Sequence, residues 1–164
     1  MKFHQYTLFF LVSIFVSVQV NGNDKENSSA QIIYVKTSTS NPGDGNQWNS
    51  AFNNINSAIE EARNLLTNNS EVQIWIQKGS YTISETNLPI GIQIYGGFNG
   101  TEVDISERTN YLTTSDNATI ISPKNTNENV FILDAVSSIT INGLIFNNLN
   151  ETRINIASDW EDIN

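Results

Sequence analysis

The chain has 164 residues, of which 8 are basic and 17 acidic, giving a formal net charge of −9; it contains one histidine and no cysteine. This acidity argues against nucleic acid or anionic membrane surfaces as partners, because like charges repel. The absence of cysteine excludes disulfide bonds and thiolate chemistry.

The first 22 residues have the pattern of a secretory signal peptide. Lys2 and His4 form a short polar head, residues 7–20 form a nearly unbroken apolar run, and Gly22 offers a small residue for cleavage. The run of about 14 residues is shorter than the roughly 20 that a membrane-spanning helix needs, although an uncleaved anchor remains the alternative. We therefore expect a secreted or cell-surface protein with no membrane span after cleavage. Cleavage would remove the only histidine, so imidazole catalysis and histidine or cysteine zinc sites are excluded, and we predict no cofactor and no metal site.

Residues 23–30 are polar and irregular, and we expect a mobile leader there. Residues 31–36 are rich in β-formers and predict the first strand. Residues 37–47 are dense in turn formers and predict a loop. Asp44 in that loop is interpreted as a turn former, with a calcium ligand as the alternative.

One amphipathic helix is predicted over residues 50–66, directly after Trp48. Its apolar residues recur at spacings of three and four and form one stripe: Phe52, Ile55, Ala58, Ile59, Ala62, Leu65 and Leu66. Only one side of this helix requires burial. We therefore expect it to cover one end of a β-structure as a cap, and not to form a βαβ crossover.

After the helix the pattern changes to short strands separated by turns, which we predict at residues 72–76, 81–83, 90–95, 119–121, 130–133, 138–142 and 144–146. The spacing from Ile74 to Ile94 and on to Ile120 is about 20 to 26 residues, which is typical of solenoid repeats. The Asn142-Gly143 pair could close a hairpin. Because the strand after it is so short, we favour a bend between two consecutive strands of one coil.

The most distinctive segment runs from Tyr95 to Glu102, Tyr-Gly-Gly-Phe-Asn-Gly-Thr-Glu, and is followed by Arg108. We expect the glycine pair to turn the chain at the end of a buried strand, since glycine accepts positive φ, and Phe98 to fold back onto the core. Glu102 and Arg108 are expected to form an ion pair that fixes the following loop. The structural motif therefore comprises Gly96, Gly97, Phe98, Gly100, Glu102 and Arg108.

A wider set of residues carries a family resemblance: Ile33-Tyr34-Val35, Asp44-Gly45, Trp48, Ala51-Phe52, Ala58-Ile59, Ala62, Ile74-Trp75-Ile76, Gly79-Ser80-Tyr81, and the segment from Ile94 to Arg108. In this order they resemble the N-terminal part of right-handed parallel β-helix proteins of the pectin-lyase-like superfamily, and most closely polymorphic outer-membrane-protein-like surface proteins. The resemblance covers residues 32–146. It implies an all-β solenoid, a right-handed parallel β-helix with an N-terminal amphipathic capping α-helix. Because such proteins usually have more coils, we expect residues 31–164 to be the capped N-terminal portion of a truncated β-helix, with a shortened paralogue as the alternative.

The resemblance implies a fold more than an activity, since its members range from polysaccharide lyases and glycosidases to adhesins. We expect a non-catalytic protein for adhesion or glycan contact, with glycans or surface proteins as partners. The alternative is a polysaccharide lyase or glycoside hydrolase, or an inactive fragment of one. No residue is assigned a catalytic role.

Two residues are predicted as possible ligand contacts. Trp75 would face outward, and could stack on a sugar, if Ile74 and Ile76 point inward; in the opposite register it would be a core residue. Asp134 ends a predicted strand and could face solvent on the coil wall. N-glycosylation sequons are present at Asn27, Asn68, Asn99, Asn117 and Asn150.

Overall fold

The computed structural model describes residues 30–37, 43–109, 118–125, 127–134, 138–147 and 154–157. The predicted signal peptide, and the predicted leader except Ala30, lie outside these residues. None of the helices in the described part of the chain has the length and apolar character that a bilayer crossing requires.

The described part is mostly β-structure with one α-helix, α1 (Ile55–Leu65). Two single-turn 3-10 helices, η1 (Trp48–Ser50) and η2 (Ile105–Glu107), lie in connections. The strands are β1 (Gln31–Val35), β2 (Val72–Gln77), β3 (Gly79–Ile83), β4 (Thr86–Asn87), β5 (Ile92–Phe98), β6 (Thr119–Pro123), β7 (Phe131–Asp134), β8 (Thr140–Asn142), β9 (Leu144–Phe146) and β10 (Ile154–Ala157).

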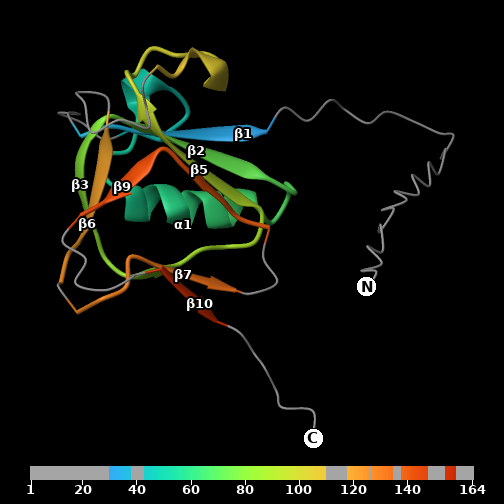
Figure 1. The fold of residues 1–164 in the computed structure, drawn as a ribbon. Helices are drawn as coiled ribbons and strands as arrows, with labels where there is room; N and C mark the ends of the chain where they lie inside the picture. Colours follow the sequence, from blue (N-terminus) through green and yellow to red (C-terminus); the bar gives the residue numbers. More distant parts are fainter. Residues whose placement is uncertain are drawn as a thin grey trace, which may run out of the picture.

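The strands form three parallel sheets that stack in a β-helix-like arrangement (Figure 1). Sheet A has the order β1-β2-β5-β8, sheet B has β3-β6-β9, and sheet C has β4-β7-β10. From β2 to β10 the chain visits sheets A, B and C in turn, three times. Every strand pair is parallel, so each pass through the three sheets extends all of them on the same side.

The core is built from columns of side chains in register. In sheet A, Ile33 pairs with Ile74, Ile74 with Ile94, and Ile94 with Ile141. The first three are buried, and Ile141 packs against the same cluster. Because side chains alternate along a strand, the residues directly before and after each of these isoleucines lie on the outer face of sheet A.

Part of the predicted repeat is wrong. Ile120 belongs to sheet B, where it pairs with Ser80 and Ile145, and the partner of Ile94 in the next pass is Ile141. The spacing fails because the corner between sheets A and B varies in length: it is crossed by one residue after β2 and after β8, but by residues 99–118 after β5.

The Asn142-Gly143 pair is a bend, as predicted. β8 lies in sheet A and β9 in sheet B, so the two strands are not a hairpin. Gly143 has a φ of 72°, which turns the chain from one sheet to the other and is a conformation that glycine adopts without a Cβ clash.

The helix begins at Ile55, later than predicted. The Asn54 side chain accepts a hydrogen bond from the Ser57 amide and caps the helix. Phe52 lies before this cap, in an extended segment that forms a parallel bridge with Val35. α1 also joins β1 to β2, which are parallel neighbours, so the prediction that it would not form a βαβ crossover is wrong.

The same helix also contacts the first strands of sheets B and C, β3 and β4. In Figure 1, α1 crosses the middle of the view between sheets A and C. Its buried face, which includes Ile55 and Ile59, belongs to the main core. The Asn56 side chain donates to the Ser84 carbonyl (3.1 Å) and accepts from the Ser84 amide (3.2 Å), so it pairs with the backbone just after β3. Arg63 donates to the carbonyl of Asn87 in β4.

We expect Asn56→Ala to lower the free energy of unfolding by about 1–3 kcal/mol, because it leaves both backbone groups of Ser84 without these partners. Asn64→Ala is the matched control on the same helix, since Asn64 is exposed and, among the described residues, its side chain bonds only to Glu61. Urea unfolding followed by circular dichroism measures both. Equal stability of the two variants would contradict the role given to Asn56.

Candidate functional site

The outer face of sheet A carries two columns of side chains in register. One column contains Ile32, Gln73, Gln93 and Thr140, and the other contains Tyr34, Trp75, Tyr95 and Asn142. Gln73, Gln93, Tyr34 and Tyr95 are half-buried, and Thr140 is exposed. Amides, hydroxyls and aromatic rings thus share one surface.

Hydrogen bonds orient the glutamine amides of this face. Gln93 Oε1 accepts from Gln73 Nε2 (3.3 Å) and from the Tyr95 hydroxyl (2.9 Å), while Gln73 Oε1 accepts from the Trp75 indole N–H (2.8 Å). Within the described residues, Gln93 Nε2 and the Thr140 hydroxyl make no hydrogen bond. Both are therefore available to a ligand, on adjacent strands.

Tyr95 remains protonated at neutral pH and keeps its donor role. Burial raises the pKa of its hydroxyl; the Arg108 charge lowers this pKa and the Glu71 carboxylate raises it, with a net increase.

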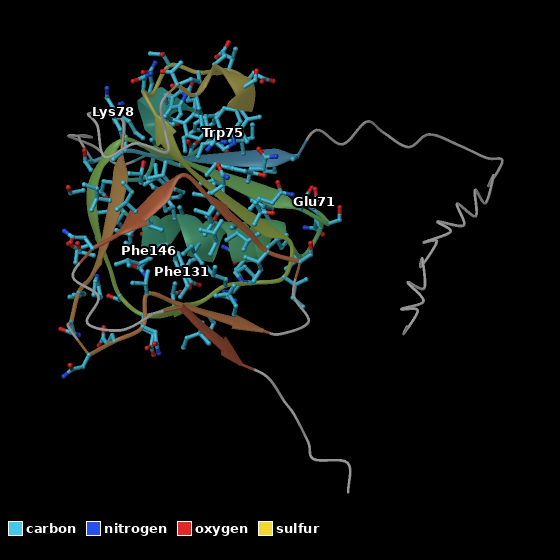
Figure 2. The ribbon with its side chains drawn as sticks, viewed as in Figure 1. Glu71, Trp75, Lys78, Phe131 and Phe146 are labelled. Carbon is cyan, nitrogen blue, oxygen red and sulfur yellow. The ribbon has the colours of Figure 1, made fainter. Side chains whose placement is uncertain are left out.

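Trp75 faces outward, with Ile74 and Ile76 buried on the inner side. Trp75 is nevertheless only 2% exposed, because its ring stacks on Phe98 at a centroid distance of 4.6 Å and meets Tyr34 edge-on. Figure 2 shows Trp75 on the side of sheet A away from α1. The isoleucines point inward, which was the condition for an outward-facing Trp75, but its neighbours bury it on that face, so a sugar could reach little of it; Tyr34 and Tyr95 on the same face are half-buried.

The glycine pair does not end the strand as predicted. β5 continues through Gly96 and Gly97 to Phe98, and Gly97 takes positive φ (83°) where the register with β2 shifts between Trp75 and Gln77. This irregularity puts Phe98 on the outer side, against Trp75 and Trp48. Phe98 is fully buried, but in this aromatic cluster rather than among the core isoleucines.

Glu102 holds the loop that follows β5. Its carboxylate accepts hydrogen bonds from the amides of Asn99 (2.6 Å), Gly100 (2.9 Å) and Thr101 (3.0 Å). Burial raises the pKa of this carboxyl, but the backbone hydrogen bonds outweigh burial and hold the pKa below its ordinary value. Glu102 is therefore ionised at neutral pH and closes a tight turn.

Arg108 fixes the far end of the same loop, but not by the predicted ion pair with Glu102. Its guanidinium donates to the Gly96 carbonyl (3.0 Å) and to Asn142 Oδ1 (3.1 Å), and it lies 5.2 Å from the Tyr95 ring centroid. The only ion pair within the described residues joins Arg63 and Glu60. Both Glu102 and Arg108 hold the loop, each through its own partners.

The described strands carry a single acidic residue. This residue is Asp134, the last residue of β7; its side chain lies outside what the structure describes. No group of three or more histidine, cysteine, aspartate or glutamate side chains is placed to bind a metal ion in that part. Asp44 accepts from the Asn46 amide and the Ser50 hydroxyl, the pattern of a turn former.

Sequence reasoning did not identify Gln73, Gln93, Tyr95 or Thr140 as site residues. A signal was present, because Gln73 and Gln93 each stand between apolar residues of a predicted strand, as an outward-facing residue would. What could not be read was the register that aligns the two glutamines with Thr140. The site is defined by this geometry alone, since no family model, no curated protein and no solved structure matches the chain.

Proposed function

We propose that this protein is a secreted or cell-surface, non-catalytic β-helix protein that contacts glycans through the outer face of sheet A, in adhesion or recognition. The observation that supports it best is that one surface carries two half-buried tyrosines together with an amide nitrogen of Gln93 and a hydroxyl of Thr140 that make no hydrogen bond within the described residues. Amides and hydroxyls match the hydroxyls of a sugar, and aromatic rings match its apolar face.

The proposal includes a right-handed solenoid. Three parallel sheets visited in a fixed order support it, and parallel connections within one sheet are right-handed in nearly all proteins. In this proposal residues 31–164 form the capped N-terminal portion of the solenoid, and α1 is its cap.

The site favours a neutral glycan over an acidic one. The chain carries a formal net charge of −9. Arg108, a cation beside this face, already bonds to Gly96 and Asn142 and lies over Tyr95. An anionic sugar would therefore meet general repulsion, and the guanidinium of Arg108 is already engaged.

The alternative function is polysaccharide cleavage. Glycoside hydrolysis commonly uses two carboxyl groups about 5 to 9.5 Å apart. The described strands carry one acidic residue, Asp134, so their sequence offers no carboxylate pair and favours binding.

A glycan array probed with the secreted full chain tests the proposal, with the affinity for any hit measured by calorimetry. We expect Gln93→Ala to weaken binding about five- to tenfold, the loss of roughly one hydrogen bond. Thr82→Ala, an exposed position of β3 in sheet B, is the control and should bind like the parent. Equal loss in both variants, or no glycan bound at all, would contradict the proposal, and release of cleaved sugar would replace it with the enzyme alternative.

A further inference from the structure

We propose that Asn68 and Asn99 carry N-linked glycans in the mature protein. These are the two sequons whose asparagine the structure describes, while Asn27, Asn117 and Asn150 lie outside the described residues. The proposal rests on the proposed entry of the chain into a secretory pathway, but it is independent of glycan contact at sheet A.

Asn68 lies in the turn that follows α1, and its side chain is exposed. Its backbone amide donates to the Leu65 carbonyl (3.1 Å), so the backbone is fixed without help from the side chain. The next residue differs: the Asn69 side chain is half-buried and donates to the same carbonyl (2.8 Å). The side-chain amide of Asn68 makes no hydrogen bond within the described residues. Ser70, which supplies the hydroxyl of the sequon, is exposed.

Asn99 lies just after β5, and its side chain is also exposed. Its backbone is held on both sides, because its N–H donates to Glu102 Oε1 and its carbonyl accepts from Gln77 Nε2 (2.6 Å). The side-chain amide makes no hydrogen bond to the rest of the described chain, and Thr101 is exposed. A glycan at Asn99 would therefore displace no contact of the fold.

The donor for this modification is an oligosaccharide linked to a polyprenyl diphosphate. The asparagine Nδ2 forms a bond to C1 of the first sugar, the bond from C1 to the diphosphate oxygen breaks, and the lipid diphosphate leaves with the electron pair. The amide loses one proton to a base of the transferase. An exposed, unbonded side-chain amide allows the product to remain in the folded protein.

The two positions lie outside the strands of sheet A that carry the proposed site. Asn68 precedes β2 and Asn99 follows β5, and these strands are parallel neighbours, so the glycans would lie at opposite ends of the sheet. Asn99 lies six positions after Gln93, which is roughly 20 Å at about 3.3 Å per strand residue. A glycan at either position would be attached beyond an end of β2 or β5 and not at a residue of the proposed site.

Translation of the full chain in the presence of endoplasmic-reticulum microsomes tests the proposal. Chains that enter the microsomes are protected from added protease, and only these chains are analysed for glycans. We expect Thr101→Ala and Ser70→Ala each to remove one glycan, seen as a faster band, while Thr101→Ser and Ser70→Thr keep it. Release of the glycans by a peptide N-glycosidase, which hydrolyses the side-chain amide bond, in ¹⁸O-water should leave labelled aspartate at positions 68 and 99. Protected chains with both asparagines unmodified would overturn the proposal. The absence of protected chains would overturn secretion and this inference with it. Binding of glycans by the purified chain would be unaffected by either result.

Discussion

Gly96→Ala is expected to lower the free energy of unfolding by about 3 kcal/mol, the upper end of the usual cost of inserting atoms into a packed site. An added Cβ would overlap the carbonyl oxygen of Gly143 and lie 2.6 Å from Leu144 Cδ2 and 2.8 Å from Thr119 Cβ. The Leu144 side chain can turn away, but the Gly143 carbonyl is backbone between β8 and β9. The clash is therefore relieved only by moving strands apart.

Gly100→Ala is the matched comparison, and we expect it to cost about 1–2 kcal/mol from its left-handed backbone. Gly100 has a φ of 97°, and the nearest atom to an added Cβ is Gln77 Nε2 at 2.5 Å, the end of a side chain that can move. Urea unfolding of both variants gives the comparison. A Gly96→Ala variant as stable as the parent, or more stable than Gly100→Ala, would contradict the close packing of β5 against the β8–β9 bend.

Glu102→Gln is expected to cost about 2–4 kcal/mol at neutral pH, because hydrogen bonds to a charged acceptor are worth about 1.5–3 kcal/mol each and only some can re-form with an amide. The carboxylate accepts three backbone N–H groups, and Trp48 donates its indole N–H to the Glu102 carbonyl (2.9 Å). The loop and the aromatic cluster should loosen together. Tryptophan fluorescence during urea unfolding reports both.

The free energies of unfolding of the parent and of Glu102→Gln should depend differently on pH. The pKa of Glu102 is lower in the folded state than in the unfolded chain. The contribution of the ionised Glu102 to the free energy of unfolding is therefore fully present above the ordinary glutamate pKa. It is lost as pH falls through the lower pKa of the folded state. The difference between parent and Glu102→Gln should shrink on acidification through that range. Glu60→Gln, which removes a surface ion pair with Arg63, is the control and should change the free energy of unfolding by less than about 1 kcal/mol at all pH values. A stability difference between the parent and Glu102→Gln that stays constant in acid would contradict the role assigned to the Glu102 carboxylate.

Local patterns predicted most of the strands because burial repeats at every second residue. Residues 72–76 alternate Val, Ile and Ile with Gln and Trp, and they form most of β2. β4 has two polar residues and gave no signal; it exists because Thr86 and Asn87 lie beside β7. By its spacing in the sequence, Phe52 belonged to the apolar stripe of the predicted helix. In the structure it forms a bridge with Val35, and the Asn54 cap starts α1 after it.

The candidate site was harder to predict because it depends on contacts between distant segments. Alternation correctly predicts that Trp75 faces outward when its isoleucine neighbours face inward. Its burial requires Tyr34 from β1 and Phe98 from β5, and the position of Phe98 follows from a register shift at Gly97. No local pattern reports such a shift. The ligand-contact role of Asp134 stays a prediction.

The variable corner between sheets A and B makes this fold suited to carrying grafted peptides. A single residue, Lys78 or Gly143, crosses the corner in two passes and residues 99–118 cross it in the other, yet Tyr81, Ile121 and Phe146 remain aligned in sheet B. Register is thus set by the side-chain columns and not by loop length. Lengthening a flexible loop costs only about 0.6 kcal/mol per doubling. Divergence in chain length, and engineered epitopes, should therefore be tolerated at this corner more readily than within any strand.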